Sequence, residues 1–342
     1  MDATRLDAGR ASAVHAEIVR EARAAGLLIP ATRAVLLRAL LGTAGLVALL
    51  AVAWTAESTP LALVPAALAG VACIQLGFIA HDAGHGSVGR GRFSNGIAGH
   101  LAFTLLNGLG FQSWRESHDR HHAFSQDESR DPDMAVDVVM SLTPRSAAEK
   151  TGLGRALLPY QGYFLWPAAL LFAHSLRLQS LARSYRAPAR YAGDALLLPL
   201  HYAGWLALPG LALGTGALRS VAVYLTCSAV MGLYLAVLFW VNHVGMPAFS
   251  PKHGLSSLEQ QVVGTRNVRH SRSLDLVFGG LDFQIEHHLM PGVPSTRLRR
   301  LQAIARPRCL AAGLPYREET PGQALASVTR HVSRIARLAH SQ

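Results

Sequence analysis

The sequence predicts an all-α integral membrane protein, with four transmembrane helices, interfacial helices beside them and a helical cap on the cytosolic side. Three observations predict this class. Half of the 342 residues are hydrophobic and only 15% are charged, whereas about a quarter of a soluble domain is charged. The apolar residues gather in runs long enough to cross a bilayer. The positive charges, nearly all of them Arg, gather outside these runs.

Three domains are expected along the chain. Residues 1–33 form a cytosolic amphipathic segment in which Arg, Glu and Ala recur, residues 34–300 form the membrane domain, and residues 301–342 form a basic cytosolic C-terminal helix. The expected spans are about 34–54, 61–80, 195–218 and 221–241.

The runs differ in how clearly they predict a span. Leu61–Ala80 holds twenty uncharged residues, which make about 30 Å of helix. The first span carries Arg38, whose long side chain can reach the membrane surface.

Two further segments are predicted as interfacial helices, about 96–112 and 156–173. The second is near the lower limit for a span and contains prolines and aromatic residues, which suit a membrane interface. Histidine clusters lie both before this run and after residue 241. If they share one site, an even number of crossings separates them, so the run is expected in the interface.

The Arg distribution predicts the orientation. The short loop Thr55–Pro60 contains no Lys or Arg, whereas four Arg precede the third span and nine Arg lie in 297–342. Positive loops face the cytosol, so both termini and the polar segments are expected there. Abundant Arg and Ala also favour a bacterial plasma membrane.

The net charge of +11 suits anionic lipid or an acidic protein. Nucleic acid is not an expected partner, because the Arg residues follow the membrane topology and the chain has no recognition motif. The three scattered cysteines predict neither a disulfide framework nor a metal site.

Histidine spacing carries the functional argument. The first box, His81-Asp-Ala-Gly-His85, follows the second span, and an i,i+4 pair faces one side of a helix, as two ligands of one metal require. The second box, His118-Asp-Arg-His121-His122, places three His on one helix face, and Asp131-Pro-Asp133 after it is a turn signal.

The third box, Gln284-Ile-Glu-His287-His288, repeats the spacing of the second box with Gln in the first place. Two helices that present the same pattern suit two metals held between them. His243 ends the last span, and an ionisable residue at membrane depth is a functional candidate. The residues expected around the ligands are Gln284, Asn242, His100, Asp82, Asp119 and Trp114.

Imidazole ligands suit iron, copper and zinc. A pair of irons with neutral ligands and open positions can bind and activate O₂, while the membrane supplies a long apolar substrate. The interpretation names no catalytic residue apart from the metal ligands.

At these residues the sequence resembles the membrane fatty-acid desaturase family, and most of all the front-end and linoleoyl-CoA-type branch with Gln opening the third box. The resemblance covers about residues 60–300. The matching stretches are HDAGH at 81–85, WRESHDRHH at 114–122, VNH at 241–243 and GGLDFQIEHHLMP at 279–291. Two departures are Met290-Pro291, where the family usually has Phe-Pro, and Ser125-Gln126, near the usual place of an Asn.

The resemblance implies a cofactor of two irons, with O₂ as co-substrate. Carried over, the ligands are His81, His85, His118, His121, His122, His287 and His288, with His243 as another. The implied activity is that of an oxidoreductase that acts on paired donors, desaturates a fatty acyl chain and reduces O₂ to water. The implied substrate is a lipid or an acyl thioester.

Some members of the family carry a fused cytochrome b5 with a His-Pro-Gly-Gly haem motif. This motif does not occur in the sequence, so no fused haem domain is expected. The electron donor is then a separate ferredoxin, cytochrome or reductase.

Two alternatives stay open at this stage. A hydroxylase or ketolase on the same scaffold, acting on a lipid or another apolar chain, has the same boxes and differs only in its product. A non-enzymatic membrane receptor or transporter with His-bound zinc is the second alternative, although the spans carry almost no buried charge.

Overall fold

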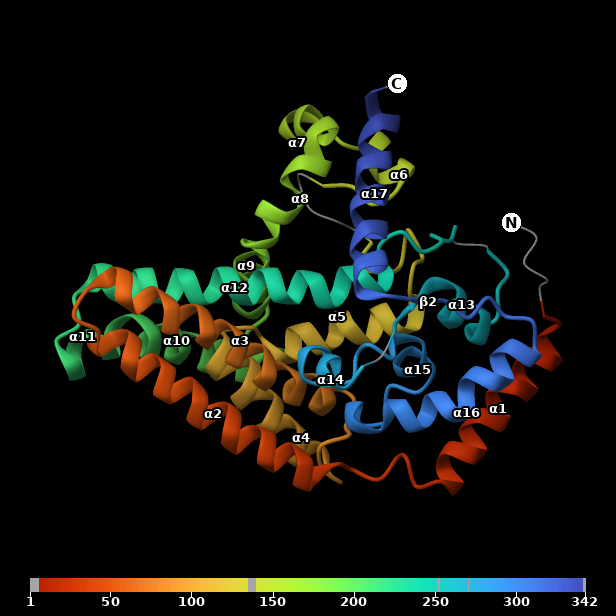
Figure 1. Cartoon of the computed structure of the whole chain (residues 1–342), viewed down its shortest axis with the longest axis horizontal. Coiled ribbons are helices and arrows are strands. Elements are labelled where there is room, and N and C mark those ends of the chain that lie inside the picture. The colour runs from red at the N-terminus through yellow and green to blue at the C-terminus, as the bar shows by residue number, and fades with distance from the viewer. Residues whose placement is uncertain (1–5, 135–139, 251–252, 270, 341–342) are drawn as a thin grey trace. The chain divides into compact units, whose positions relative to one another are not determined.

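A computed structural model describes residues 6–134, 140–250, 253–269 and 271–340. The first five residues of the expected N-terminal segment and the last two of the C-terminal one fall outside these ranges. The described chain is helical almost throughout (Figure 1). Its strands are β1 (Asn267–Val268) and β2 (Glu318–Glu319), which pair in parallel.

The chain divides into two compact units. The first unit comprises Met1–Ile29, Ser117–Leu165 and Val237–Gln342, and the second comprises Pro30–Glu116 and Trp166–Ala236. The second unit contains most of the apolar helices, and the first unit contains most of the polar ones.

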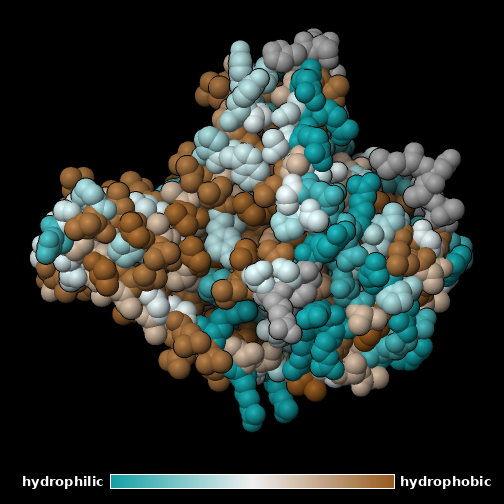
Figure 2. All heavy atoms as spheres, in the orientation of Figure 1, coloured by the Kyte–Doolittle hydropathy of each residue, from teal (hydrophilic) through white to brown (hydrophobic). Residues whose placement is uncertain are grey.

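Among the described residues, four helices are long and apolar enough to cross a membrane. They are α2 (Thr32–Thr55), α3 (Thr59–Gly84), the segment Ala192–Leu213 and α12 (Ala217–His243). Leucines and valines along them are exposed, for example Leu40 at 67% and Leu211 at 86%, and Figure 2 shows hydrophobic residues gathered over α2 and α11. These side chains suit a lipid environment, so the prediction of an all-α integral membrane protein with four spans is confirmed.

The third span differs in detail from the expected run 195–218. It joins α10 (Ala192–Tyr202), the π-helical turns η3 (Ala203–Ala207) and α11 (Leu208–Leu213). Pro199 lies inside α10 and breaks the regular bonding, which a π-helical turn accommodates. The span ends at Leu213 because Gly214 adopts a positive φ of 65° and turns the chain toward α12.

The segments expected at the interface are short helices. Residues 156–173 contain the end of α7 (Gly152–Leu157), the turn η2 (Leu158–Tyr160), α8 (Gln161–Ala169) and the start of α9 (Phe172–Arg186). Residues 96–112 contain the end of α4 (Arg92–Gly99), the π-helical η1 (His100–Asn107) and the start of α5 (Phe111–Phe124). None of these helices reaches the length of a span, and their place at a membrane surface stays a prediction.

Close approach of two spans depends on Gly70 of α3. A Cβ atom at Gly70 would lie 2.5 Å from the carbonyl oxygen of Cys227 and 3.0 Å from Val230 Cβ on α12. Only a residue without a side chain allows the two backbones to come this near.

Gly70→Ala should therefore destabilise the protein by about 1–3 kcal/mol, the usual cost of overpacking. The matched control is Gly45→Ala on α2, where an added Cβ has open space around it. The control should be neutral or stabilising by up to about 1 kcal/mol, because Ala favours helix over Gly. Thermal unfolding in detergent measures both, and equal melting temperatures would show that the close contact is unimportant.

The first unit is built around buried sides of amphipathic helices. α1 (Ala8–Ala24) is capped at its N-terminus by Asp7, whose carboxylate accepts the backbone N–H groups of Gly9 and Arg10. Arg308 on α16 (Leu298–Ala311) pairs with Glu17 and Glu21 of α1. These ion pairs hold the N-terminal helix α1 against α16 within this unit.

The remaining elements of the first unit surround its polar interior. They are α6 (Pro144–Ala148), α13 (Ser257–Gly264), α14 (Arg272–Phe278), α15 (Gln284–Leu289), the turn η4 (Ser295–Arg297) and α17 (Pro321–His340). Ile335 of α17 packs with Ala147 and Leu158 in a small apolar core.

Candidate metal centre

The second box lies on α5, whose start is capped from another helix. Asp194 of α10 accepts the backbone N–H groups of Gln112 and Ser113 at 3.1 and 2.9 Å, so it satisfies donors that the first turn of a helix leaves unpaired. One face of α5 then presents the buried His118, His121 and His122. Asp119, which was expected near the ligands, is exposed.

The third box lies on the short helix α15, and two glycines lead into it. Gly280 has a φ of 96°, and a Cβ atom there would lie 2.3 Å from the carbonyl oxygen of Ser295. A side chain at this position would therefore displace the start of the helix. The helix buries both His287 and His288.

Three histidines from three elements of the first unit come together. His121 of α5, His243 at the end of α12 and His288 of α15 each offer a nitrogen atom, and these atoms lie within 4.8 Å of one another. We call this group the three-histidine cluster. The spacing places three imidazoles where one ion could bind all of them.

Two rings of this cluster are oriented by hydrogen bonds on their far side. His121 Nδ1 lies 3.0 Å from both carboxylate oxygens of Asp131, and His288 Nδ1 lies 2.8 Å from Gln261 Oε1 on α13. An Nδ1–H that donates to an oxygen leaves Nε2 as the atom that faces a metal. This arrangement is typical of metal-binding histidines.

His243 is held differently. Its Nε2 lies 3.0 Å from Gln284 Nε2, and the Gln284 Oε1 atom accepts a hydrogen bond from Asn242 Nδ2 at 3.2 Å. The buried Nδ1 of His243 has no hydrogen-bond partner among the described residues. A buried nitrogen without a partner costs free energy unless an ion uses it, so the cluster fits a bound metal.

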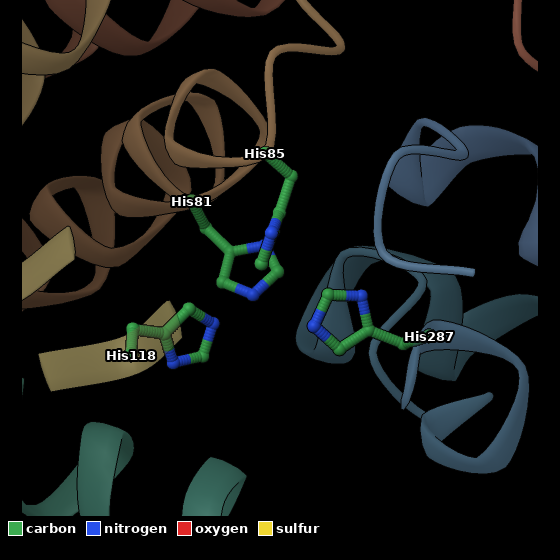
Figure 3. A group of neighbouring side chains, drawn as sticks. All are labelled: His81, His85, His118 and His287. Carbon is green, nitrogen blue, oxygen red and sulfur yellow. The ribbon is translucent and has the colours of Figure 1, made fainter. Parts of the chain in front are cut away.

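The other three boxed histidines of the first unit are neighbours as well. The ring centroids of His118 and His122 lie 4.6 Å apart, those of His122 and His287 also 4.6 Å, and those of His118 and His287 6.2 Å. Figure 3 shows His118 on α5 and His287 on α15.

The first box belongs to the second unit. His81 and His85 lie one turn apart where α3 ends, as Figure 3 shows, and their ring centroids are 5.0 Å apart. His81 Nδ1 lies 3.8 Å from Asp82, and the Trp114 ring lies 6.0 Å from the His81 ring. The side chain of Trp114 fits there because Gly84 lacks a Cβ atom, which would approach the indole ring to 2.8 Å.

His100 has a structural environment. Its Nδ1 lies 3.1 Å from Thr104 Oγ1 and 3.5 Å from the Asp194 carboxylate. It therefore belongs to the polar group that caps α5, and among the described residues it joins none of the groups with metal-binding geometry.

Two titratable side chains of this unit, His121 and Glu286, have unusual electrostatic surroundings. Burial lowers the pKa of His121, but the carboxylates of Asp133 and Asp131 outweigh burial and raise it to about 9. An ion that binds there replaces a proton on the ring. Burial raises the pKa of Glu286 to about 7, although hydrogen bonds from Tyr316 and Asn267 favour its charged form.

Sequence reasoning missed two of the residues that orient the rings. Asp131 was interpreted only as part of a turn, and in the structure it also accepts the backbone N–H of Gln126 at 2.8 Å. Gln261 has no signal in the sequence, because only the fold brings α13 against the boxes. Gln261 contacts both the second and the third box, since its Oε1 faces His288 Nδ1 and its Nε2 donates to the carbonyl oxygen of His122 at 2.7 Å.

Asp131→Asn should weaken metal binding by about 10–100-fold, the usual effect of removing the partner of a metal-binding His. The amide keeps the shape but removes the negative charge that favours a strong donor at His121. Asp133→Asn separates the charge from the hydrogen bond, because the Asp133 carboxylate also raises the pKa of His121 but lies 3.4 Å from His121 Nδ1 on a side chain that is 56% exposed. It should weaken metal binding less than Asp131→Asn does. Titration of the metal-free protein with Co²⁺ measures both affinities, and equal losses would argue against a specific role of Asp131.

Comparisons with known proteins point to one family. The family model for fatty acid desaturase matches residues 58–320, a range that contains all three boxes. The chain is 28% identical over 292 residues to a Delta(8)-fatty-acid desaturase of Euglena gracilis, which covers 81% of this chain and 68% of that protein.

Two further relatives are desaturases of other kinds. A Delta(5) fatty acid desaturase of Caenorhabditis elegans is 29% identical, over 73% of this chain and 58% of its own. A Delta 8-(E)-sphingolipid desaturase of Lachancea kluyveri is 27% identical, over 72% of this chain and 47% of its own. The chain thus spans about half to two thirds of the length of these curated relatives. Because the family model matches most of the chain, including every boxed histidine, the protein belongs to the fatty acid desaturase family.

Proposed function

We propose that the protein is an O₂-dependent membrane desaturase that introduces a double bond into a fatty acyl chain. It would use a pair of irons held by histidines, and electrons from a separate donor. The observation that carries the proposal is the three-histidine cluster, whose rings are oriented by Asp131 and Gln261, in a chain of the fatty acid desaturase family.

Eight histidines are the proposed ligands. For the six in the first unit, ring proximity supports the assignment: His118, His121, His122, His243, His287 and His288. For His81 and His85, the support is the i,i+4 spacing of the first box and the family to which the chain belongs. When bound, the irons supply the activation of O₂ that removes hydrogen from an unactivated methylene.

The chain's own residues prepare this chemistry by positioning. Asp131 and Gln261 hold two imidazoles so that Nε2 faces the ion, and Gln284 holds the ring of His243. The apolar spans present a lipid-soluble chain from the membrane. The substrate must lie so that two adjacent C–H bonds meet the oxidant, which is a matter of orientation.

The proposed membrane orientation places the boxes and both termini in the cytosol. The support is the concentration of Arg in 177–190 and 297–342, set against its absence from the loop between the first two spans. A cytosolic site is accessible to a ferredoxin, cytochrome or reductase. The relatives named above are eukaryotic, so the bacterial plasma membrane rests on composition alone.

Expression in a host with simple lipids, followed by lipid profiling with double-bond localisation, tests the proposal. The expected product is a fatty acyl chain that has lost two hydrogens, and the same host with the His121→Ala variant should lack it. A product that has gained one oxygen would instead support the hydroxylase alternative. Unchanged lipids despite iron-loaded protein and a working electron donor would contradict the proposal for this class of substrate.

A further inference from the structure

The side of α15 that faces away from the boxed histidines contacts residues that belong to none of the histidine boxes. α15 has six residues, and Gln284, His287 and His288 lie on the side of the boxes. Ile285 and Glu286 are both fully buried on the other side. So short a helix is not stable by itself, so its position depends on what holds this second side.

Asn267 of β1 holds the start of the helix. Its Oδ1 accepts the backbone N–H of Ile285 at 2.8 Å, one of the N–H groups that the first turn of a helix leaves without a partner. Its Nδ2 donates to Glu286 Oε2 at 2.8 Å and also contacts Tyr316 Oη at 2.8 Å. One amide side chain therefore binds both the backbone and the acidic side chain of α15.

Tyr316 completes the arrangement from the C-terminal region. Its hydroxyl donates to Glu286 Oε1 and accepts from Gln302 Nε2 of α16 at 3.3 Å. The neighbouring backbone is tied to the same place, because Asn267 N–H donates to the carbonyl oxygen of Arg317 at 3.0 Å. The pairing of β1 with β2 continues this link.

Both oxygens of Glu286 are thus occupied by partners that lie far away in the sequence. A buried carboxylate without such partners would be costly, and with them it becomes a rigid anchor. Because His287 and His288 follow Glu286 directly, a shift of this anchor moves the two imidazoles.

We propose that Asn267, Glu286 and Tyr316 are positioning residues that hold the third box in its metal-binding geometry. The proposal deepens the proposed function and rests on it for the identity of the metal. It also gives residues 316–319, which follow the last box, a part in the metal centre.

The test combines metal binding with backbone protection. Tyr316→Phe removes one hydroxyl and should lower the Co²⁺ affinity several-fold, whereas Asn267→Ala should lower it by about 10–100-fold. The visible spectrum of bound Co²⁺ should shift in both variants, because ligand geometry changes. Hydrogen exchange of the amides in 284–289 should become faster in the metal-free variants, since the bond to Ile285 N–H is lost or loosened.

Two controls separate positioning from general damage. Tyr163→Phe removes the same hydroxyl at a side chain that is 87% exposed, and it should leave affinity, spectrum and exchange unchanged. Glu286→Gln keeps the shape and one oxygen that can still accept from Asn267 Nδ2, so it should bind Co²⁺ more tightly than Glu286→Ala.

The outcomes distinguish this inference from the proposed function. Wild-type affinity, spectrum and exchange in both Tyr316→Phe and Asn267→Ala would overturn the positioning role of these residues, even if the enzyme desaturates lipids. A wild-type protein that binds no metal would overturn the proposed function, while faster exchange of 284–289 in the variants would still support the positioning role. Unchanged exchange in that case would overturn both.

Discussion

His121→Ala should remove one of two irons and reduce desaturase turnover by more than about 100-fold. Loss of a residue that only hydrogen-bonds to a metal-binding His already lowers metal affinity or activity by about 10–100-fold, and loss of the ligand itself should cost more. His121 belongs to the three-histidine cluster with His243 and His288. Two imidazoles cannot hold an ion as a rigid set of three can. Iron analysis of the purified variant and lipid profiling of the expressing host measure the two effects.

The matched control for this variant is His253→Ala. His253 lies in the same unit, and its Nδ1 accepts the backbone N–H of Leu255 at 3.0 Å. Within the described part of the chain it joins no group of histidines with metal-binding geometry. It should retain both iron and turnover. Full iron content in His121→Ala would show that the cluster is not a metal site.

His81→Ala tests the first box and should abolish desaturation while the protein stays in the membrane. His81 lies in the last turns of α3, and the apolar part of that span is unchanged by the substitution. The variant should also contain about one iron in place of about two, as expected when one ion of a two-metal site loses a ligand. Membrane fractionation, iron analysis and product analysis are made on the same preparation.

The control in the same unit is His174→Ala. His174 of α9 is half-buried, and its ring centroid lies 6.2 Å from that of Tyr224. This variant should keep its activity. Desaturation at the wild-type rate in His81→Ala would remove the first box from the mechanism.

The spans could be predicted from the sequence because they depend on composition, a property that acts over about twenty residues. Their ends could not be predicted as well. The third span was expected to reach residue 218, but Gly214 adopts a left-handed conformation and ends the helix at Leu213. A glycine within an apolar run does not reveal which conformation it takes.

The histidine boxes could be found because their ligands repeat at helical spacing within a few residues. The side chains that orient these histidines do not recur at helical spacing. Gln261 lies on α13, Asn267 on β1 and Tyr316 in the loop before β2, and they reach the boxes only through the fold. Asp131 was visible in the sequence, yet its pattern also suits a simple turn, and only its position 3.0 Å from His121 Nδ1 reveals the second role.

The most direct measurement of the central hypothesis is metal analysis of the purified wild-type protein combined with Mössbauer spectroscopy. If the boxed histidines hold a pair of irons, the protein should contain about two irons per chain, and the spectrum should show two coupled sites that His121→Ala reduces to one. A single zinc ion per chain, or irons that leave the spectrum unchanged in His121→Ala, would contradict the assignment of these histidines as ligands of a diiron site.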